Sequence, residues 1–337
     1  MSQPLTPKKI SVVVPVKNAS KTIGVCLDAI YANNDADFEV AVVDDGCTDG
    51  TMDIVSKYKC AVLKNNLHSG VSGARNTGGF AANGDVLLFI DADIVVPKNI
   101  LSEISARIRY TDVAAVVGML SENIRFNNFS SQYKNLWMCY TFDNLPDQIS
   151  LIFSSIAAIK KSVFLELGGF DVNYTIPNVE DNEVGIRLRD AGHNIILDKT
   201  LKVEHLKKYS FYSLLKTHYF RTKGLIKLYN RKRLIGLFKS NPSNVPNLFI
   251  FNLPLTIALI FSLSSLFLKN NFFPRITIFF FLISSFLFVN YKWLSLLNKK
   301  RGFFFALKSL LYLPVESIVI IFGLIVGQIE HLMGRRY

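Results

Sequence analysis

The feature that most constrains the fold of this chain is an apolar run, Val86–Ile90, followed directly by the acidic segment Asp91-Ala92-Asp93. The run predicts a buried strand of a parallel sheet, and such strands place functional residues just past their carboxyl ends. Asp91 and Asp93 lie two positions apart, so in an extended backbone their side chains share one side. Two adjacent carboxylates repel each other and favour a divalent cation such as Mg²⁺ or Mn²⁺ between them. Taken alone, the segment also fits a solvated turn after a strand.

Segments on both sides of this run alternate between the patterns of strands and helices. This alternation predicts βαβ units, and hence an α/β fold with a mainly parallel, Rossmann-like sheet covered by helices on both faces. The aromatic-rich segment 126–143 is assigned to neither pattern. Strands are expected at 10–16, 38–43, 61–64, 86–90 and 152–159, and helices at 21–31, 51–57, within the glycine-rich segment 70–79, from Pro97 onward and at 178–191.

Three polar loops follow expected strands, after Val16, after Val43 and after Ile90. Because the carboxyl ends of parallel strands meet at one edge of a sheet, these loops are expected to gather there, which favours a nucleotide-dependent site. Two of the motifs also fit structural roles. Asp44-Asp45-Gly46 fits a tight turn. The glycines of 70–79 match neither the Walker nor the dinucleotide spacing, so they also fit helix packing, with Arg75 on the surface.

Apolar segments dominate the last 90 residues. Residues 248–268 carry no charge over 21 positions, enough to cross a bilayer core of about 30 Å at about 1.5 Å per residue. A second span is expected at 273–291. Segment 303–329 is interrupted by charged residues and a proline, so we expect an amphipathic lead-in to about Tyr312 and then a third span. A soluble core helix is the alternative for this last segment.

Positive charge is concentrated just before the first apolar run. Residues 199–239 hold twelve Lys or Arg against Glu204, and so account for +11 of the net charge of +12. The anionic face of a membrane suits this segment better than nucleic acid, for which no docking motif is present. Together with Lys299–Arg301, this basic segment predicts by the positive-inside rule that the preceding domain lies in the cytoplasm. Arg335 and Arg336 conflict with three spans, unless the third segment is re-entrant.

The cysteines and the start of the chain agree with a cytosolic domain. Cys26, Cys47, Cys60 and Cys139 show no metal-ligand spacing, so reduced thiols are expected. Segment 1–9 is polar and basic, and we do not expect it to act as a cleavable signal peptide.

Five motifs together resemble the family 2 inverting glycosyltransferases, in their order as well as their residues. The resemblance covers about residues 10–225 and implies a GT-A fold, a nucleotide-sugar donor that is most often UDP-linked, and a divalent metal, Mn²⁺ or Mg²⁺. The motifs are Val-Val-Val-Pro-Val-Lys-Asn (12–18), Val-Asp-Asp-Gly-Cys-Thr-Asp-Gly-Thr (43–51), Gly-x-x-x-Ala-Arg-Asn-x-Gly (70–78), Asp-Ala-Asp (91–93) and Glu-Asp-Asn-Glu-x-Gly-x-Arg-Leu (180–188).

Carried over onto the matching positions, the resemblance assigns three kinds of role. Asp181 would be the general base that takes a proton from an acceptor hydroxyl. Asp93 would bind the metal, together with Asp91 and His205, and the metal would offset charge on the departing diphosphate. The residues implied for nucleotide-sugar binding are Pro15, Val16, Asp44, Asp45, Arg75, Asp91, Ala92, Asp93 and Arg221.

Several of these residues also fit structural roles. His205 fits a structural histidine, and Arg221 fits one more basic side chain near the bilayer. Asp181 fits a capping box in which Asn178 is the helix N-cap. The chain departs from the usual family pattern at Cys47, where serine is common, and this small change leaves the resemblance intact.

The expected organisation has three parts: a cytosolic GT-A domain at 1–225, a basic juxtamembrane segment at 226–247, and a transmembrane region of about three helices at 248–337. The expected function is a membrane-anchored, metal-dependent hexosyl transfer to a hydroxyl of a lipid-linked or membrane-proximal acceptor, in the synthesis of cell-envelope glycan or glycolipid. One alternative is a polyprenyl-phosphate glycosyltransferase, whose acceptor is already ionised and needs no base. The other is a non-catalytic, nucleotide-sugar-binding assembly partner.

Overall fold

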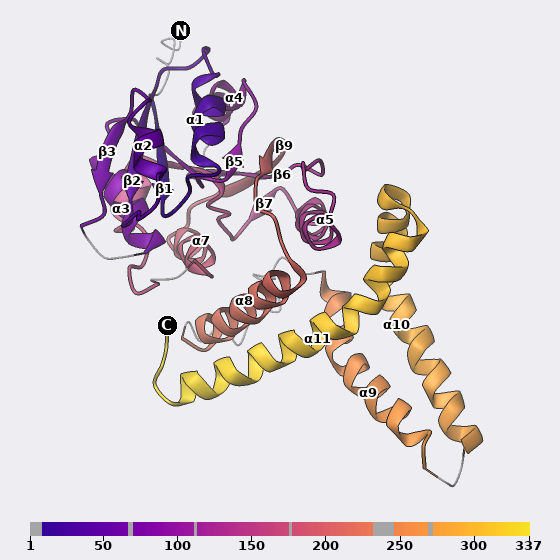
Figure 1. Ribbon diagram of the computed structural model, residues 1–337. Coiled ribbons are helices and arrows are strands. Elements are labelled where there is room, and N and C mark those ends of the chain that lie inside the picture. Colours follow the sequence, from indigo (N-terminus) through magenta and orange to yellow (C-terminus); the bar gives the residue numbers. More distant parts are fainter. Residues whose placement is uncertain (1–8, 67–69, 111–112, 175–176, 232–245, 269–271) are drawn as a thin grey trace. The chain divides into compact units, whose positions relative to one another are not determined.

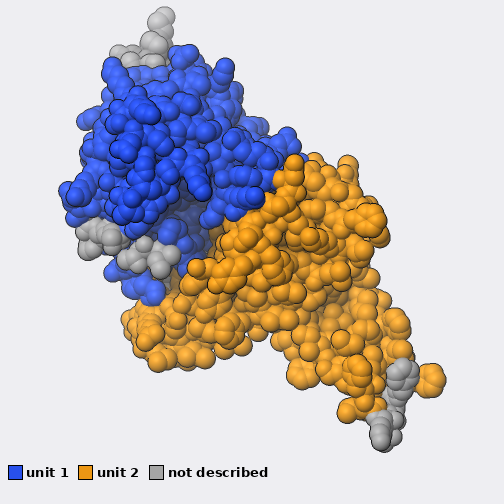
Figure 2. All heavy atoms as spheres, in the orientation of Figure 1, with its two compact units in different colours: residues 1–126, 145–208, 337 blue, residues 127–144, 209–336 orange. Residues whose placement is uncertain are grey.

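The computed structural model describes residues 9–66, 70–110, 113–174, 177–231, 246–268 and 272–337. Contacts divide the chain into two compact units, which Figure 2 colours separately. The first unit comprises residues 1–126, 145–208 and 337, and the second comprises residues 127–144 and 209–336. The expected limits at residues 225 and 247 rest on the sequence pattern, whereas these two units are defined by contacts. Those limits therefore stay a prediction. Most of the expected juxtamembrane segment, residues 232–245, lies outside the described residues.

The first unit is built on one mixed sheet (Figure 1). Its order is β3-β2-β1-β4-β8-β6-β9-β5, with β7 also paired to β9. The four strands β3, β2, β1 and β4 run parallel, whereas β8 runs antiparallel between β4 and β6. The predicted mainly parallel sheet is therefore confirmed. The strands are β1 (Ile10–Val16), β2 (Phe38–Asp44), β3 (Ala61–Lys64), β4 (Val86–Ile90), β5 (Ile94–Val95), β6 (Ala115–Leu120), β7 (Gln148–Ile149), β8 (Ile156–Lys160) and β9 (Ile195–His205).

Strand β4 lies in the core, and all five of its side chains are fully buried. Burying apolar side chains of this size contributes about 1.5–3 kcal/mol each relative to exposure. This burial fixes the end of β4, and therefore the position of Asp91 at the edge of the sheet. The described helices of this unit are α1 (Ile23–Tyr31), α2 (Thr51–Val55), α3 (Val71–Ala81), α4 (Ile100–Tyr110), α6 (Lys161–Glu166) and α7 (Glu180–Asp190). Five of these helices contact strands of the sheet, and α2 contacts α1.

Three local expectations differ from the structure. The helix expected from Pro97 begins at Ile100, and the strand expected from residue 152 begins at residue 156. The capping box at α7 is wrong, because the N-cap is Val179 and it makes no side-chain cap bond. Glu180 instead turns back, and its Oε2 accepts the backbone N–H of Asn178 at 2.6 Å.

The second unit consists of helices around an aromatic core. Most of the aromatic-rich segment 126–143 forms α5, and Tyr133 of this helix packs edge-on to Trp293 with ring centroids 5.7 Å apart. The phenolic hydroxyl of Tyr133 donates to Oε2 of Glu316 at 2.6 Å. The elements are α5 (Phe129–Asp143), α8 (Phe211–Arg231), the 3₁₀ helix η2 (Asn247–Phe251), α9 (Asn252–Ser265), α10 (Phe272–Arg301) and α11 (Phe303–Leu332).

Among the described residues of this unit, three helical stretches are long and apolar enough to cross a membrane, judged by length and composition. They are Leu248–Ser265, Phe273–Arg301 and Phe303–Leu332. The first two match the expected spans. The third is one continuous helix that runs through Pro314, where a lead-in followed by a separate span was expected.

Candidate active site

The candidate active site lies in the first unit, where β1, β2 and β4 end. Because these strands are parallel, Val16, Asp44 and Asp91 come to the same edge of the sheet. Pro15 precedes Val16 at the end of β1, and Ala92 lies buried between the two aspartates that follow β4. The structure therefore brings these small predicted residues together with the acidic ones.

Asp44 and Asp45 hold the loop after β2 in shape. Oδ1 of Asp44 accepts the backbone N–H groups of Gly46 and Cys47 at 3.1 and 2.8 Å. Partial burial opposes ionisation of Asp44, but these hydrogen bonds outweigh it and hold its pKa below the usual value. Oδ1 of Asp45 accepts the backbone N–H of Gly70 at 2.8 Å, and so fixes the start of α3. Both carboxylates thus hold the shape of this loop, and their role in nucleotide-sugar binding stays a prediction.

The loop after β1 is tied to the same turn. Oδ1 of Asn18 accepts the backbone N–H of Thr48 at 2.8 Å. Sγ of Cys47 lies 3.4 Å from the backbone nitrogen of Asn18 and 3.6 Å from the carbonyl oxygen of Val16. A thiol at this position thus makes the two contacts that a serine hydroxyl would make at shorter range. The departure from the common family pattern therefore preserves the geometry.

Arg75 is the centre of a buried charge network. It lies on α3, and its Nη2 is 2.9 Å from Oδ1 of Asp91, while its Nη1 is 2.9 Å from Oε1 of Glu180. Oδ2 of Asp91 accepts a hydrogen bond from the hydroxyl of Ser155 at 2.6 Å. Burial alone would lower the pKa of Arg75, but the two carboxylates raise it above the ordinary value, so its charge is retained. The alternative of a surface arginine is wrong.

Asp93 and His205 form the second polar pair of the site. Nε2 of His205 lies 3.2 Å from Oδ2 of Asp93, and antiparallel pairing of β5 with β9 places Ile94 opposite His205. Burial opposes ionisation of Asp93, but His205 and Lys207 outweigh it and lower the pKa of this carboxyl. The structure therefore joins two of the three predicted metal ligands, and directs the third, Asp91, toward Arg75.

This donor set fits a divalent cation that takes only part of its ligands from the protein. In the described part of the chain no three His, Cys, Asp or Glu side chains converge on one point. A carboxylate and an imidazole suit Mn²⁺ or Mg²⁺ when phosphate and water oxygens complete the shell. Asp93 and His205 are the residues of this chain that would hold such an ion.

Asp181 lies in the first turn of α7 and is buried. Its Oδ1 accepts the backbone N–H of Asn182 at 2.8 Å. Glu180, which precedes it, is held by Arg75, so Asp181 is fixed to the network around Asp91. Gly185 lets α7 approach the neighbouring chain, because a Cβ there would lie 2.7 Å from Cα of Leu151.

The family model for glycosyl transferase family 2 matches residues 11–168, from β1 to the end of α6. The chain carries a glycosyl transferase family 2 domain. The match includes Asp44, Arg75, Asp91 and Asp93, and it ends before Asp181.

Three relatives agree with this assignment. Glycosyltransferase GlyG of Streptococcus pneumoniae is 29% identical over 114 residues, which cover 32% of this chain and 38% of that protein. The poly(ribitol-phosphate) beta-glucosyltransferase of Bacillus spizizenii is 38% identical over 93 residues, 25% of this chain and 15% of that protein. The probable glycosyltransferase YdaM of Bacillus subtilis is 29% identical over 205 residues, which cover 56% of this chain and 48% of that protein. The match spans less than half the length of each relative.

A solved structure confirms the fold. The mannosyltransferase PcManGT of Pyrobaculum calidifontis, in complex with GDP-Man and Mn²⁺, matches with a TM-score of 0.60 at 16% identity. The match covers 97% of this chain and 88% of that protein. This chain therefore has the predicted GT-A fold.

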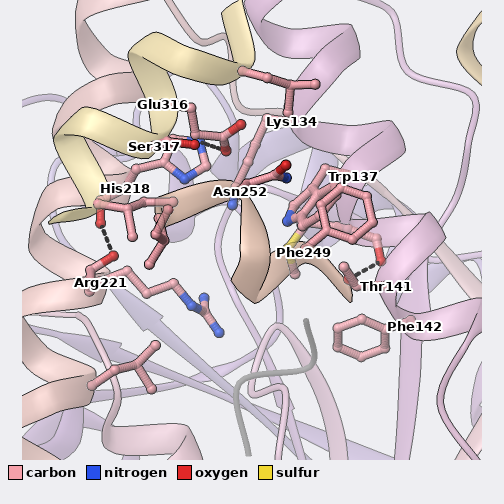
Figure 3. A pocket seen from close by; sticks show the side chains of 16 residues that line it. Lys134, Trp137, Thr141, Phe142, His218, Arg221, Phe249, Asn252, Glu316 and Ser317 are labelled. Carbon is pink, nitrogen blue, oxygen red and sulfur yellow. Dashed lines mark hydrogen bonds and ion pairs between the residues drawn. The ribbon is translucent and has the colours of Figure 1, made fainter. Parts of the chain in front are cut away.

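The second unit contains a cavity of about 130 Å³ between α5, α8, α9 and α11 (Figure 3). Lys134, His218 and Arg221 contribute nitrogen atoms to its wall, and Trp137 and Phe249 contribute aromatic rings. Burial, with the cations of Lys134 and Arg221 nearby, holds the pKa of His218 well below its usual value. Arg221, which the sequence assigned to the donor, thus lines a cavity of the second unit.

Two residues of the site were missed from the sequence. Ser155 reaches Asp91 because the antiparallel pairing of β8 with β4 sets Ile156 opposite Ile90. Glu180 belongs to one of the family motifs, but its ion pair with Arg75 does not follow from the motif. No sequence signal marks Ser155. The run of acids at the start of α7 could have indicated a buried cationic partner for Glu180.

Proposed function

We propose that this glycosyltransferase is membrane-anchored and moves a sugar, with inversion, from a nucleotide-sugar to a hydroxyl of a lipid-linked or membrane-proximal acceptor. The observation that carries the proposal is the network in which Arg75 joins Asp91 to Glu180, next to Asp181. It links the end of β4, expected at the donor, to the helix that carries the expected base. We propose a UDP-linked sugar as the donor, because the motifs favour it.

The donor would bind at the edge where β1, β2 and β4 end. Asp44 and Asp45 would contact the uracil and ribose, and Asp91 would lie by the ribose and diphosphate. Pro15, Val16 and Ala92 would line the same cleft with backbone and small side chains. Arg75 acts in this proposal as a positioning residue, because both ends of its guanidinium are already bound to Asp91 and Glu180.

Asp93 and His205 would hold the metal. When bound, the ion supplies positive charge that offsets the negative charge developing on the departing diphosphate. Metal dependence is a proposal here, and the carboxylate–imidazole pair at 3.2 Å supports it.

Asp181 would act on the acceptor. Its carboxylate accepts the hydroxyl proton while the acceptor oxygen bonds to the anomeric carbon from the face opposite the diphosphate. The bond between the anomeric carbon and the diphosphate oxygen breaks in the same step, and the nucleoside diphosphate leaves with that electron pair. The configuration at the anomeric carbon inverts.

Membrane attachment would come from the second unit, with the catalytic domain on the cytoplasmic side. Lys299, Lys300 and Arg301 at the end of α10 support this orientation through the positive-inside rule. An acceptor carried by a lipid is consistent with this location. A polyprenyl phosphate is the second candidate acceptor, favoured by the same apolar helices, and it would make Asp181 dispensable.

The test compares the wild type with Asp181→Asn in detergent. Each protein is given Mn²⁺ or Mg²⁺, a panel of nucleotide-sugars and total membrane lipids, and transfer is followed by release of nucleoside diphosphate. Asp190→Asn, on the same helix and at an exposed position, is the matched control. Loss of transfer in Asp181→Asn alone supports a hydroxyl acceptor. Undiminished transfer in both variants would favour the phosphate acceptor, and no transfer from any donor would favour a non-catalytic binding protein.

Arg221 has a test of its own. The sequence-based proposal assigns it to the donor diphosphate, so Arg221→Gln should raise the KM for the nucleotide-sugar and leave the KM for the acceptor unchanged. A raised acceptor KM with an unchanged donor KM would contradict this role. It would instead assign the cavity of the second unit to the acceptor.

A further inference from the structure

Helices α8 and α11 lie side by side within the second unit (Figure 1). Two glycines of α11 allow this close approach. A Cβ at position 323 would lie 2.8 Å from the carbonyl oxygen of Tyr219, and one at Gly327 would lie 2.7 Å from that of Lys223. Gly323 and Gly327 are one turn apart, a spacing that lets two helix backbones pack closely. The half of α11 from Glu316 to its end is therefore bound tightly to α8.

Polar side chains join the two helices along this contact. Nζ of Lys223 is 2.9 Å from Oε1 of Glu330, and Lys227 forms a second ion pair with the same carboxylate. The side-chain amide of Asn230 donates to Oε1 of Gln328 at 2.6 Å. These links hold α8 and α11 at the same depth relative to any membrane.

Helix α8 is too charged to cross a bilayer. A basic side chain at the centre of a spanning helix costs about 2.5–3.5 kcal/mol, and α8 carries five within 21 residues. Helix α8 is also absent from the described helices with the length and composition of a span. Because α11 is fixed to α8 at one depth, its second half is kept out of the hydrocarbon as well. The basic residues of α8 are Lys216, Arg221, Lys223, Lys227 and Arg231.

The opposite face of α11 carries an apolar stripe. Its residues follow one another at intervals of three or four, so they share one side of the helix. Phe322 lies at the edge of this stripe, where its ring stacks on that of Tyr219 of α8 with ring centroids 5.7 Å apart. Each is between 38% and 76% exposed. The stripe consists of Val315, Ile318, Phe322, Ile325, Ile329 and Leu332.

The α9–α10 hairpin differs from the α8–α11 pair in its exposed side chains and in the direction of its helices. Its candidate spans carry exposed apolar side chains on several sides, including Phe261, Phe281 and Phe288. Figure 1 shows α11 leaving this hairpin and continuing along α8. If the hairpin crosses the bilayer, the second half of α11 runs beside the bilayer surface.

We propose that α8 and residues 316–332 of α11 form an amphipathic platform on the membrane surface, and that only α9 and α10 cross. Its partner is an anionic lipid surface: the apolar stripe of α11 enters the boundary between headgroups and acyl chains, and the exposed Arg335 and Arg336 just past the end of α11 attract the headgroups. Two crossings return the chain to the side of the catalytic domain. Arg335 and Arg336 then lie on the same side as Lys299–Arg301, and the conflict with the positive-inside rule disappears.

The first test is the side of the membrane on which each connection lies. One epitope tag is inserted after Leu268, at the turn of the hairpin, and another is added after Tyr337, in two full-length proteins. We expect the tag after Leu268 to be reachable by antibody from outside intact cells, and the tag after Tyr337 to be reachable only once the membrane is opened. Both tags reachable from outside would show three crossings and overturn the proposal. Transfer activity is not part of the readout, so failure of the proposed function would not affect the result.

The second test measures depth. A spin label at Ile325→Cys is compared with one at Ile260→Cys on α9, with the native cysteines replaced by serine and the proteins in anionic vesicles. We expect Ile325→Cys at about 5–10 Å below the headgroups and Ile260→Cys near the bilayer centre. A central position for both labels would overturn the proposal. So would a label at Ile325→Cys that no lipid-soluble quencher reaches, because a second copy of the chain would then cover the stripe.

Discussion

Arg75 and Glu180 are 105 positions apart in the sequence, yet Nη1 of the arginine lies 2.9 Å from Oε1 of the glutamate, with the two side chains only 3% and 4% exposed. The pair joins α3 to the first turn of α7. A buried charge that loses its partner is destabilising by about 3–5 kcal/mol. The position of Asp181, the next residue, therefore depends on an ion pair that contacts no substrate in our proposal.

The first prediction follows from this pair. We expect Glu180→Gln to lower the free energy of unfolding by about 3 kcal/mol, since Arg75 keeps its charge while one of its two carboxylate partners is lost. Chemical denaturation of the purified protein measures this. The matched control is Glu204→Gln, which breaks the more exposed Arg125–Glu204 pair and should cost about 1 kcal/mol or less. Equal losses in the two variants would contradict the central role of Arg75.

The second prediction concerns the metal. In our proposal Asp93 and His205 are the described residues that hold the ion, so loss of either one removes half of what they supply. We expect His205→Ala to weaken Mn²⁺ binding by at least about tenfold, the lower limit for loss of even an outer ligand partner. Calorimetric titration of Mn²⁺, with and without UDP, measures this directly. Asp190→Asn serves as the control, and unchanged affinity in His205→Ala would remove the histidine from the site.

The core strands and the edge of the sheet could be predicted because their causes are local. An apolar run such as Val86–Ile90 needs a buried position, and the residue that follows it must emerge at the edge. Helix α5 could not be predicted in this way. Eleven of its fifteen residues are buried, and six of these eleven are polar. Burial in this helix therefore does not follow hydrophobicity, and the periodic pattern of an amphipathic helix is missing from its sequence.

The contacts that the site residues make with one another could not be predicted from the sequence, for a different reason. The contact of Ser155 with Asp91 depends on the register of two antiparallel strands, and the contact of Arg75 with Glu180 depends on how α7 packs. Neither leaves a trace in local composition. The same holds for α11, whose apolar residues fit a membrane span and a surface stripe equally well until Gly323 and Gly327 are seen against α8.

The third prediction tests the packing of α7. In Gly185→Ala the new methyl group would meet backbone atoms of Leu151 and Ile152 at 2.7 Å, and backbone cannot move aside as a flexible side chain can. We expect a loss of about 1–3 kcal/mol of stability and reduced transfer, because Asp181 is displaced. Gly24→Ala is the control, since its methyl group would lie 3.5 Å from Ile54. That variant should be stabilised by about 0.5–1 kcal/mol, and a loss as large as that of Gly185→Ala would show that helical glycines matter here for another reason.

The last prediction is a pH dependence of folding centred on Glu39. Its carboxylate accepts hydrogen bonds from the hydroxyl of Ser11 and the backbone N–H of Asn83, both at 2.6 Å, and lies 3.0 Å from Nζ of Lys9. Partial burial opposes ionisation, but these contacts outweigh it and lower the pKa of Glu39 from 4.5 to about 2. Between these two values the unfolded chain binds more protons than the folded one, so stability falls as the pH is lowered.

We expect the free energy of unfolding of the wild type to fall by about 1–2 kcal/mol more than that of Glu39→Gln between pH 5 and pH 3. Chemical denaturation at each pH measures this. The control Glu166→Gln, which removes an exposed carboxylate, should follow the wild type. Parallel curves for wild type and Glu39→Gln would mean that the contacts of Glu39 do not favour its charged form.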